Sequence, residues 1–219
     1  MQFDQTNPVV KLCVDGMNAE ATGDIAQATA CFTEAWNIVT NDFERLTAAH
    51  YMARNQDDKN VELKWNLAAL EYAGNIDDDS IQAQLPSLCL NAARSYEHLG
   101  DLPNATLLYK KAAENSEHLP AGQYTEMIRN GIAAGLKRAG VTVPGSEILD
   151  EMIDRWCVRK NLRALAMVLP AYVGSLGTEA DTNKLIDALS RLSAMQVLTD
   201  PELEQIRNLI ADLSGKQEA

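Results

Sequence analysis

Apolar residues recur along most of this chain at the three- and four-residue spacing of amphipathic helices. Two C-terminal stretches each place five apolar residues on one helical face: Leu185, Ile186, Leu189, Leu192 and Met195, then Leu203, Ile206, Leu209, Ile210 and Leu213. No sustained alternation of apolar and polar residues, the pattern of a half-buried strand, is present. The spacing therefore predicts an all-α protein. In the C-terminal half the predicted helices cover residues 121–139, 146–160, 162–172, 178–195 and 201–213.

Two stretches within the first 113 residues share the same motif at the same spacing. Residues 12–36 and 89–113 each contain Gly-Asp, followed at identical offsets by an alanine, an aromatic residue and a second alanine. The first copy has Gly23, Ala28, Phe32 and Ala35, and the second has Gly100, Ala105, Tyr109 and Ala112. Glycine supplies the left-handed backbone that ends a helix, and aspartate suits the start of the next helix. Since small residues let two helices cross closely, each stretch predicts an antiparallel helix pair.

Weaker copies of the pattern lie between and after these two. Residues 43–72 predict two helices around a polar turn, in which Asp57-Asp58 replaces Gly-Asp. The interval between the two Gly-Asp pairs exceeds two repeat lengths, which places extra residues at about 74–84. The helix predicted at 121–139 falls where the first helix of a fourth pair is expected.

This pattern resembles the tetratricopeptide repeat, a helix–turn–helix unit of about 34 residues. The two clear copies span residues 8–41 and 85–118. The resemblance implies a right-handed superhelix of antiparallel helix pairs, a tetratricopeptide-like α-solenoid, over residues 1–140. Residues 141–219 would then form a C-terminal helical extension, either as worn repeats or as a separate helical cap.

The resemblance also implies a function, because such repeats bind proteins or peptides in a concave groove lined by the first helix of each pair. Projection of the motif places six residues on or beside that groove: Tyr51, Arg54, Asn91, Arg94, Arg129 and Asn130. Guanidinium groups match carboxylates, so the recurring arginines predict an acidic partner or a peptide C-terminus. The competing interpretation is that each arginine pairs with a carboxylate of its own protein, as Arg94 would with Glu97 one turn away.

Charge and composition narrow the choice of partners. The net charge of −12 would repel a phosphate backbone, so we expect no nucleic-acid partner. One basic cluster, Arg155, Arg159, Lys160 and Arg163, interrupts this composition and is interpreted as a solvated helix end. No apolar run is long enough for a membrane span, and the first residues lack the regions of a secretory signal. We therefore expect a cytoplasmic protein without a membrane partner.

Motifs that carry chemistry are missing from the sequence. It has no phosphate-binding glycine loop, paired-histidine metal motif or nucleophile elbow. Its cysteines, Cys13, Cys31, Cys89 and Cys157, lie far apart and are predicted to be small buried side chains rather than metal ligands. We expect a non-enzymatic adaptor without cofactor or metal, as a monomer or a homodimer. Two alternatives remain: a scaffold that dimerises through the C-terminal helices, and a non-catalytic helper module of an enzyme.

Overall fold

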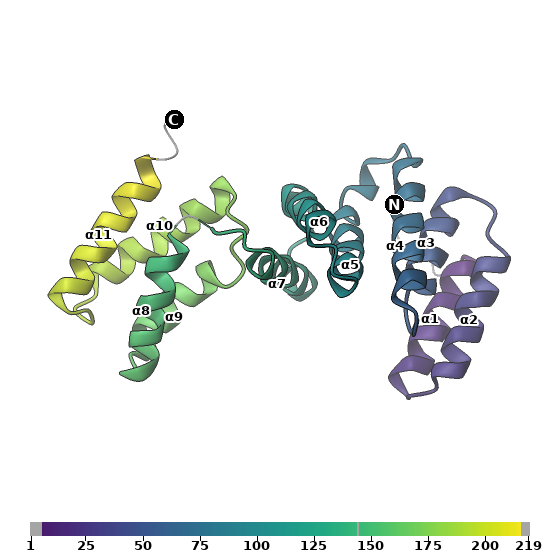
Figure 1. Cartoon of the computed structure of the whole chain (residues 1–219), viewed down its shortest axis with the longest axis horizontal. Helices are drawn as coiled ribbons and strands as arrows, with labels where there is room; N and C mark the ends of the chain where they lie inside the picture. Colours follow the sequence, from purple (N-terminus) through teal and green to yellow (C-terminus); the bar gives the residue numbers. More distant parts are fainter. Residues whose placement is uncertain (1–5, 144, 216–219) are drawn as a thin grey trace. The chain divides into compact units, whose positions relative to one another are not determined.

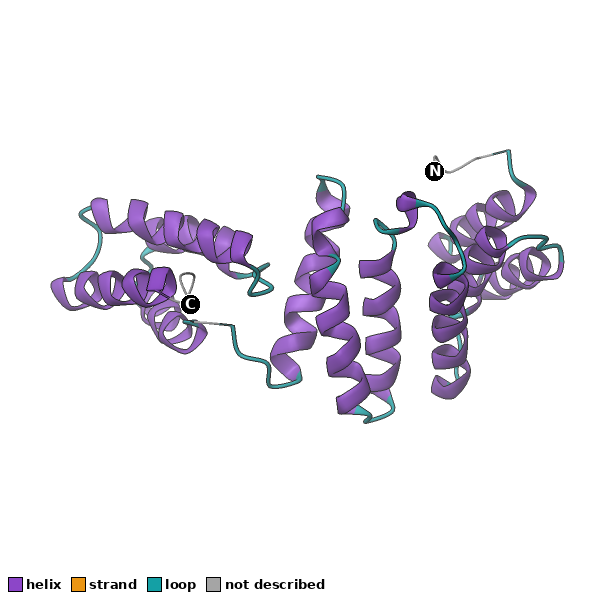
Figure 2. Cartoon of the chain, turned by 90° about the horizontal axis from the view of Figure 1, so that it is seen from above, coloured by secondary structure: helices purple, strands orange, loops and turns teal. Residues whose placement is uncertain are grey.

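The computed structural model describes residues 6–143 and 145–215, and every regular element in these residues is a helix (Figure 2). This confirms the all-α class that the apolar spacing predicts. The contacts between residues divide the chain into two compact units, Met1–Ala121 and Gly122–Ala219.

The first unit consists of consecutive helix pairs (Figure 1). Its elements are α1 (Pro8–Ala21), α2 (Ile25–Asn37), α3 (Asp42–Met52), α4 (Lys59–Gly74), η1 (Asp79–Ile81), α5 (Leu85–His98), α6 (Leu102–Glu114) and η2 (Ser116–His118). The most extensive contacts join α1 with α2, α3 with α4, and α5 with α6. Contacts of α2 with α3 and of α4 with α5 join one pair to the next.

The second unit holds the remaining helices. They are α7 (Gln123–Arg138), α8 (Ser146–Val158), α9 (Leu162–Tyr172), α10 (Glu179–Ala194) and α11 (Asp200–Gly215). The repeat pattern sets the boundary at residue 140, whereas the contacts group α7 with the C-terminal helices. The side chains of Arg129 and Lys137 on α7 bind Asp181 and Asp150 of this unit. Apolar spacing carries no information about such distant ion pairs.

A shared turn shapes the two clear helix pairs. Gly23 and Gly100 have φ angles of 83° and 78°, in the left-handed region that glycine adopts without a steric cost. Asp24 and Asp101 follow them and cap α2 and α6. Each aspartate accepts a hydrogen bond from the backbone N–H three residues later, at 3.0 and 3.2 Å respectively. The local prediction at both turns is confirmed.

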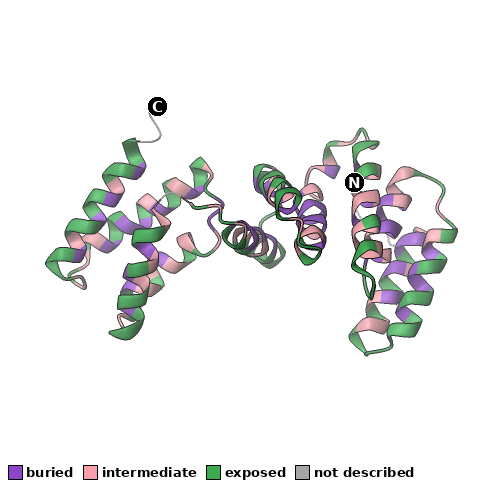
Figure 3. Ribbon diagram, in the orientation of Figure 1, coloured by how far each residue is buried: buried purple, intermediate pink, exposed green. Residues whose placement is uncertain are grey.

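Small residues bring the paired helices together. Buried positions recur along the paired helices α1 and α2 (Figure 3). The six predicted packing residues are all buried: Ala28, Phe32, Ala35, Ala105, Tyr109 and Ala112. On the opposing helix, a Cβ atom added to Gly16 would lie 2.3 Å from a ring carbon of Phe32. Contact at that distance is impossible without a shift, so the packing of α1 on α2 depends on this glycine.

The turn between α3 and α4 differs from the prediction at Asp57-Asp58. The left-handed residue is Asn55, with φ 57°, and asparagine tolerates this region better than most other residues do. Asp58 does cap α4, since its side chain accepts a hydrogen bond from the Asn60 N–H at 2.8 Å. This turn is therefore longer than those of the other two pairs. The extra residues expected further along form the connection between α4 and α5, which includes η1.

The same turn recurs between α8 and α9 without its sequence signature. Lys160 has φ 55°, and Asn161 caps α9 by accepting a hydrogen bond from the Ala164 N–H at 3.3 Å. The Asn161 N–H donates to the carbonyl five residues earlier at 2.9 Å, the distance also found at Asp24 and Asp101. Lysine and asparagine thus stand in the places of glycine and aspartate. Left-handed backbone costs a residue with a Cβ atom roughly 1 to 2 kcal/mol.

The second unit has its own apolar core. Its buried residues come from α8, α9, α10 and α11 and include Leu149, Met152, Trp156, Val168, Leu185, Leu189, Leu192, Ile206 and Leu209. Trp156 donates its indole N–H to Glu202 at 3.0 Å, and Glu202 also binds the Arg159 guanidinium. Thr199 donates to the same carboxylate through its N–H and its hydroxyl, both at 3.0 Å. Of the ten apolar residues predicted on the faces of the last two helices, six are buried and four, Ile186, Met195, Leu203 and Ile210, are half-buried.

Candidate functional site

Three of the six predicted binding residues line one pocket of the first unit: Arg54, Asn91 and Arg94. The pocket lies among α3, α4 and α5, has a volume of about 290 Å³ and is here called the α3–α5 pocket. Its lining residues are His50, Ala53, Arg54, Asn55, Glu62, Asn66, Asn91, Arg94 and His98. The pocket is thus polar, with both charge signs represented on its walls.

Arg54 is already bound to a carboxylate of its own unit. Its Nε donates to both oxygens of Glu20 at 3.0 and 2.9 Å, and its Nη2 donates to one of them at 2.6 Å. Asn55 donates to the same carboxylate. Burial opposes ionisation of Glu20, but the hydrogen bonds from Arg54 and Asn55 outweigh it and lower the pKa of this carboxyl. The positive charge of Arg54 is therefore compensated.

Arg94 has no such partner. Its side chain is exposed and makes no hydrogen bond or ion pair with any residue that the structure describes. Glu97, the partner expected in the competing interpretation, accepts a hydrogen bond from the Tyr109 hydroxyl. The side chain of Asn91, one turn before Arg94, also makes no hydrogen bond to the described residues. Together these two side chains offer unused N–H donors at the pocket.

A polar network joins α4 to α5 at this pocket. Asn66 donates its side-chain N–H to the Ser95 hydroxyl at 2.9 Å, and that hydroxyl donates to Glu62 at 2.8 Å. Glu62 also pairs with Lys59 at 2.8 Å, and the ring of His98 lies 3.9 Å away. Burial opposes ionisation of Glu62, but the bonds from Lys59 and Ser95 lower its pKa. The negative charge of Glu62 is thus balanced by Lys59, and the positive charge of Arg94 remains.

His50 contributes a buried nitrogen without a partner. Its Nδ1 is out of contact with solvent and has no hydrogen bond to any residue in the described part of the chain. Burial, and then the nearby charge of Arg54, lower the pKa of His50 to about 4. The imidazole is therefore neutral at pH 7 and adds no charge to the pocket.

Tyr51 lies in the apolar core rather than on the pocket wall. Its ring stacks on Phe32 with centroids 5.4 Å apart, and only 9% of the residue is exposed. The hydroxyl lies 3.3 Å from the sulfur of Met17. Packing thus accounts for the position of this tyrosine.

Arg129 and Asn130 belong to α7 and therefore to the second unit. The Arg129 guanidinium binds Asp181 and donates to the backbone carbonyl of Gly174 at 3.2 Å. Both partners lie in the second unit, and Asp181 is buried. Arg129 therefore has the internal carboxylate partner of the competing interpretation.

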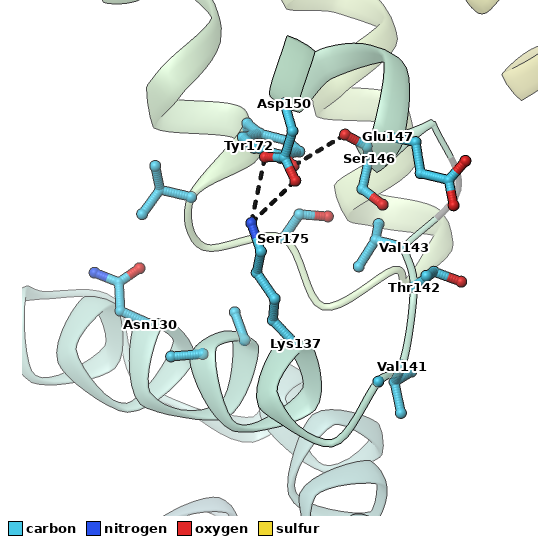
Figure 4. Close-up of a pocket in the computed structure, with 14 residues that line it drawn as sticks. Asn130, Lys137, Val141, Thr142, Val143, Ser146, Glu147, Asp150, Tyr172 and Ser175 are labelled. Atoms are coloured by element: carbon cyan, nitrogen blue, oxygen red, sulfur yellow. Dashed lines mark hydrogen bonds and ion pairs between the residues drawn. The ribbon is translucent and has the colours of Figure 1, made fainter. Parts of the chain in front are cut away.

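A second pocket, of about 400 Å³, lies beside Asn130 within the second unit (Figure 4). Alanine and valine side chains form much of its wall. At its polar edge Lys137 lies 3.0 Å from Asp150, which accepts a hydrogen bond from the Tyr172 hydroxyl at 2.7 Å. Burial opposes ionisation of Asp150, but Tyr172 and Lys137 lower its pKa. Because Lys137, the cation among the lining residues, is already paired, this pocket suits an acidic ligand less well.

The sequence gives one signal for the pocket residues that the repeat pattern misses. Asn66 stands one repeat length of about 34 residues after Phe32, so a polar residue occupies the place of a packing aromatic. A buried amide must find hydrogen-bond partners, and Asn66 finds one in Ser95. His50 gives no comparable signal, because it stands among the small residues of a weak repeat copy.

The residues that the structure describes contain no group of three or more His, Cys, Asp or Glu side chains that could hold a metal ion. None of their helices combines the length and the apolar character needed to cross a membrane. Cys13, Cys31 and Cys89 are buried as predicted, but Cys157 is exposed, because it lies on the solvent side of the last turn of α8.

Comparisons of the chain with protein-family models, with curated protein sequences and with solved structures gave no match.

Proposed function

We propose that this chain is a non-enzymatic adaptor that binds an acidic segment of a protein or peptide, with a carboxylate of that segment in the α3–α5 pocket. The observation that carries the proposal is the unpaired guanidinium of Arg94 beside the unused amide of Asn91. The chain as a whole has a net charge of −12 and repels anions, so an unpaired arginine at a pocket is a specific local feature.

The donors at this pocket suit a carboxylate. Arginine presents five N–H groups in a planar arrangement that matches two carboxylate oxygens, and Asn91 adds an amide donor. The charges of Arg54 and Glu62 are compensated by Glu20 and Lys59, so Arg94 sets the sign of the pocket. A volume of about 290 Å³ lies at the lower end for ligand pockets and accommodates one or two side chains.

We further propose that the helix pairs of the first unit are tetratricopeptide-like and stack as a right-handed superhelix. The shared left-handed turn at Gly23 and Gly100 and the burial of Ala28 and Ala105 support this assignment. So do the contacts that join each pair to the next. In this arrangement α1, α3 and α5 line the groove, and Arg94 lies on the last of them.

Binding rather than catalysis also fits the composition of the pocket. None of its lining residues is a serine, threonine or cysteine that could act as a nucleophile. The homodimer alternative rests on the apolar faces of α10 and α11, yet Leu189 and Ile206 are fully buried within their own unit. No observation favours the enzyme-helper alternative either. Both alternatives stay predictions.

Selection of a random displayed-peptide library on the intact chain tests the proposal. We expect the recovered peptides to be rich in aspartate and glutamate. Replacement Arg94→Ala should weaken their binding about tenfold or more, because a charge-assisted hydrogen bond contributes roughly 1.5 to 3 kcal/mol. The melting temperature should stay unchanged, since Arg94 has no partner among the described residues.

Two further variants separate the role of the guanidinium from that of charge. Arg94→Lys keeps the charge but loses the planar donor arrangement, so its binding should be intermediate. Arg45→Ala is the matched control, because Arg45 is a partly exposed arginine on α3 that pairs with Asp42 at 2.8 Å outside the pocket. If the selected peptides bound Arg94→Ala as tightly as the wild type, Arg94 would be an ordinary surface residue.

A further inference from the structure

The turn between α8 and α9 carries a basic surface, here called the α8–α9 tip and defined as residues 155–163. This segment contains four bases and no acid, in a chain with 19 Lys and Arg against 31 Asp and Glu. Arg155 binds Gln205 at 2.8 Å, and Arg159 binds Glu202. The side chains of Lys160 and Arg163 make no hydrogen bond or ion pair with any described residue. The tip therefore presents two unpaired cations.

Apolar side chains accompany these cations. Val158 is 83% exposed and Leu162 is 70% exposed, which are the two largest exposed fractions of any large apolar side chain in the described part of the chain. A single exposed apolar residue is ordinary at a protein surface. Here two exposed apolar residues lie within one turn, next to two unpaired cations. The surface therefore combines an apolar contact area with charged groups, as protein docking sites do.

The left-handed turn does not require the charge of Lys160. The turns at Gly23-Asp24 and Gly100-Asp101 have the same left-handed residue and the same hydrogen bonds with glycine and aspartate. Glycine would fit the position of Lys160 at lower conformational cost. Lys160 adds a positive charge to this helix-pair end, whereas Asp24 and Asp101 add a negative charge to the other two. The left-handed backbone and its hydrogen bonds are the same at all three turns. The turn itself therefore does not explain the lysine at this strained position.

We propose that the α8–α9 tip docks an acidic segment of a partner protein, one that carries apolar side chains next to its carboxylates. Lys160 and Arg163 pair with the carboxylates, and Val158 and Leu162 are covered by the apolar side chains. The tip belongs to the second unit and shares no residue with the α3–α5 pocket. The inference therefore stands whether or not that pocket binds a carboxylate.

A protein segment fits the tip better than an anionic membrane does. Sequence-readable recognition of anionic lipids uses clusters of roughly four to eight basic residues, and here two of the four bases are already engaged. A membrane surface is also extended, so it would meet the field of the whole chain, whose net charge is −12. A short acidic segment meets the tip alone.

A peptide-display selection on the intact chain tests this inference, with Lys160→Gly/Arg163→Ala as the counter-variant. The double variant removes both unpaired cations and restores the glycine of the equivalent turns, so its melting temperature should equal or exceed that of the wild type. We expect a class of acidic and apolar peptides that binds the wild type at least tenfold more tightly than the double variant. Binding of this class should weaken as salt is raised.

Controls assign the effect to the tip. Lys64→Glu changes an exposed base on α4 of the first unit and should leave binding of this class unchanged. Val158→Ser should weaken it severalfold, because the apolar contact is lost. The Arg94→Ala variant should bind this class normally, which separates it from ligands of the α3–α5 pocket.

Three outcomes would overturn the inference. One is the recovery of no peptide that distinguishes the wild type from the double variant. Another is sedimentation of the wild type, but not of the double variant, with phosphatidylserine vesicles in the absence of a tip-dependent peptide, which would identify a membrane as the occupant. The third is a concentration-dependent increase in the mass of the wild-type chain alone that the double variant abolishes, which would identify a second copy.

Discussion

Acidification should destabilise the first unit through His50. Burial and the charge of Arg54 hold the pKa of His50 at about 4 in the folded chain, against 6.5 for an unperturbed histidine. The unfolded chain therefore binds more protons between these values, so stability is lost as pH falls from about 6.5 to 4. Each pH unit inside this window changes the free energy of unfolding by about 1.4 kcal/mol. From pH 7 to pH 5 the His50 contribution amounts to about 2 kcal/mol.

The variant His50→Gln removes this titration and keeps a polar side chain at the same place. We expect it to lose about 2 kcal/mol less stability than the wild type between pH 7 and pH 5. Hydrogen exchange of the slowest amides of α4 in the intact chain measures the opening free energy of the first unit. Carbon-13 NMR of labelled histidine rings measures the pKa of His50 directly.

His118→Gln is the matched control, since His118 is 43% exposed in its side chain and lies beside Glu117. It should lose as much stability on acidification as the wild type. Lowered carboxyl pKa values, such as that of Glu62, affect all three proteins alike and cancel in the comparison. A His50 resonance that titrates near 6.5, or equal acid losses in His50→Gln and the wild type, would refute the reasoning.

Two other substitutions test the packing of each unit. Gly16→Ala should destabilise the first unit by roughly 1 to 3 kcal/mol in urea unfolding, because the new Cβ meets the Phe32 ring at 2.3 Å; an unchanged midpoint would mean that the ring moves aside freely. Glu202→Gln should destabilise the second unit by roughly 2 kcal/mol at pH 7, because the buried carboxylate binds Trp156, Arg159 and Thr199. Burial opposes ionisation of Glu202, but the bonds from Thr199 and the charge of Arg159 lower its pKa. The stability difference between the wild type and Glu202→Gln should therefore have its full value above pH 5 and vanish as pH falls through the lowered pKa. A difference that stays constant down to pH 3 would contradict the role of the charge.

The contrast between two turns shows what could be predicted from the sequence. At Gly23 and Gly100 the glycine itself indicates the left-handed backbone, so the pattern predicts the two helix pairs correctly. At Lys160 an equivalent turn carries a residue that is rare in this conformation, so the residue type does not indicate the left-handed backbone. Pattern-based prediction thus succeeds where conformational preference and structure agree, and fails where a strained residue takes the position.

The candidate site shows a similar limit. Projection of the repeat motif predicts Arg54, Asn91 and Arg94 on the first helices of successive pairs, and the three residues line one pocket. Which arginine is unpaired could not be predicted, because Glu20 lies 34 residues before Arg54 and Asp181 lies 52 residues after Arg129. Such pairings depend on how separate helices pack and on the reach of each side chain. The local spacing of residues in the sequence carries no information on either of these.

The recurrence of one backbone turn with two different residue pairs has a consequence for how such a protein can diversify. Because Gly23, Gly100 and Lys160 close their helix pairs with the same backbone hydrogen bonds, mutation at this one position changes the charge of a loop end without disturbing the packed helices. The alanines and aromatic rings behind the turn have no such freedom, as the contact of Gly16 with Phe32 shows. Selection can therefore act on the ends of the hairpins and on their interiors separately, and new binding specificities can arise at the ends while the architecture is inherited intact.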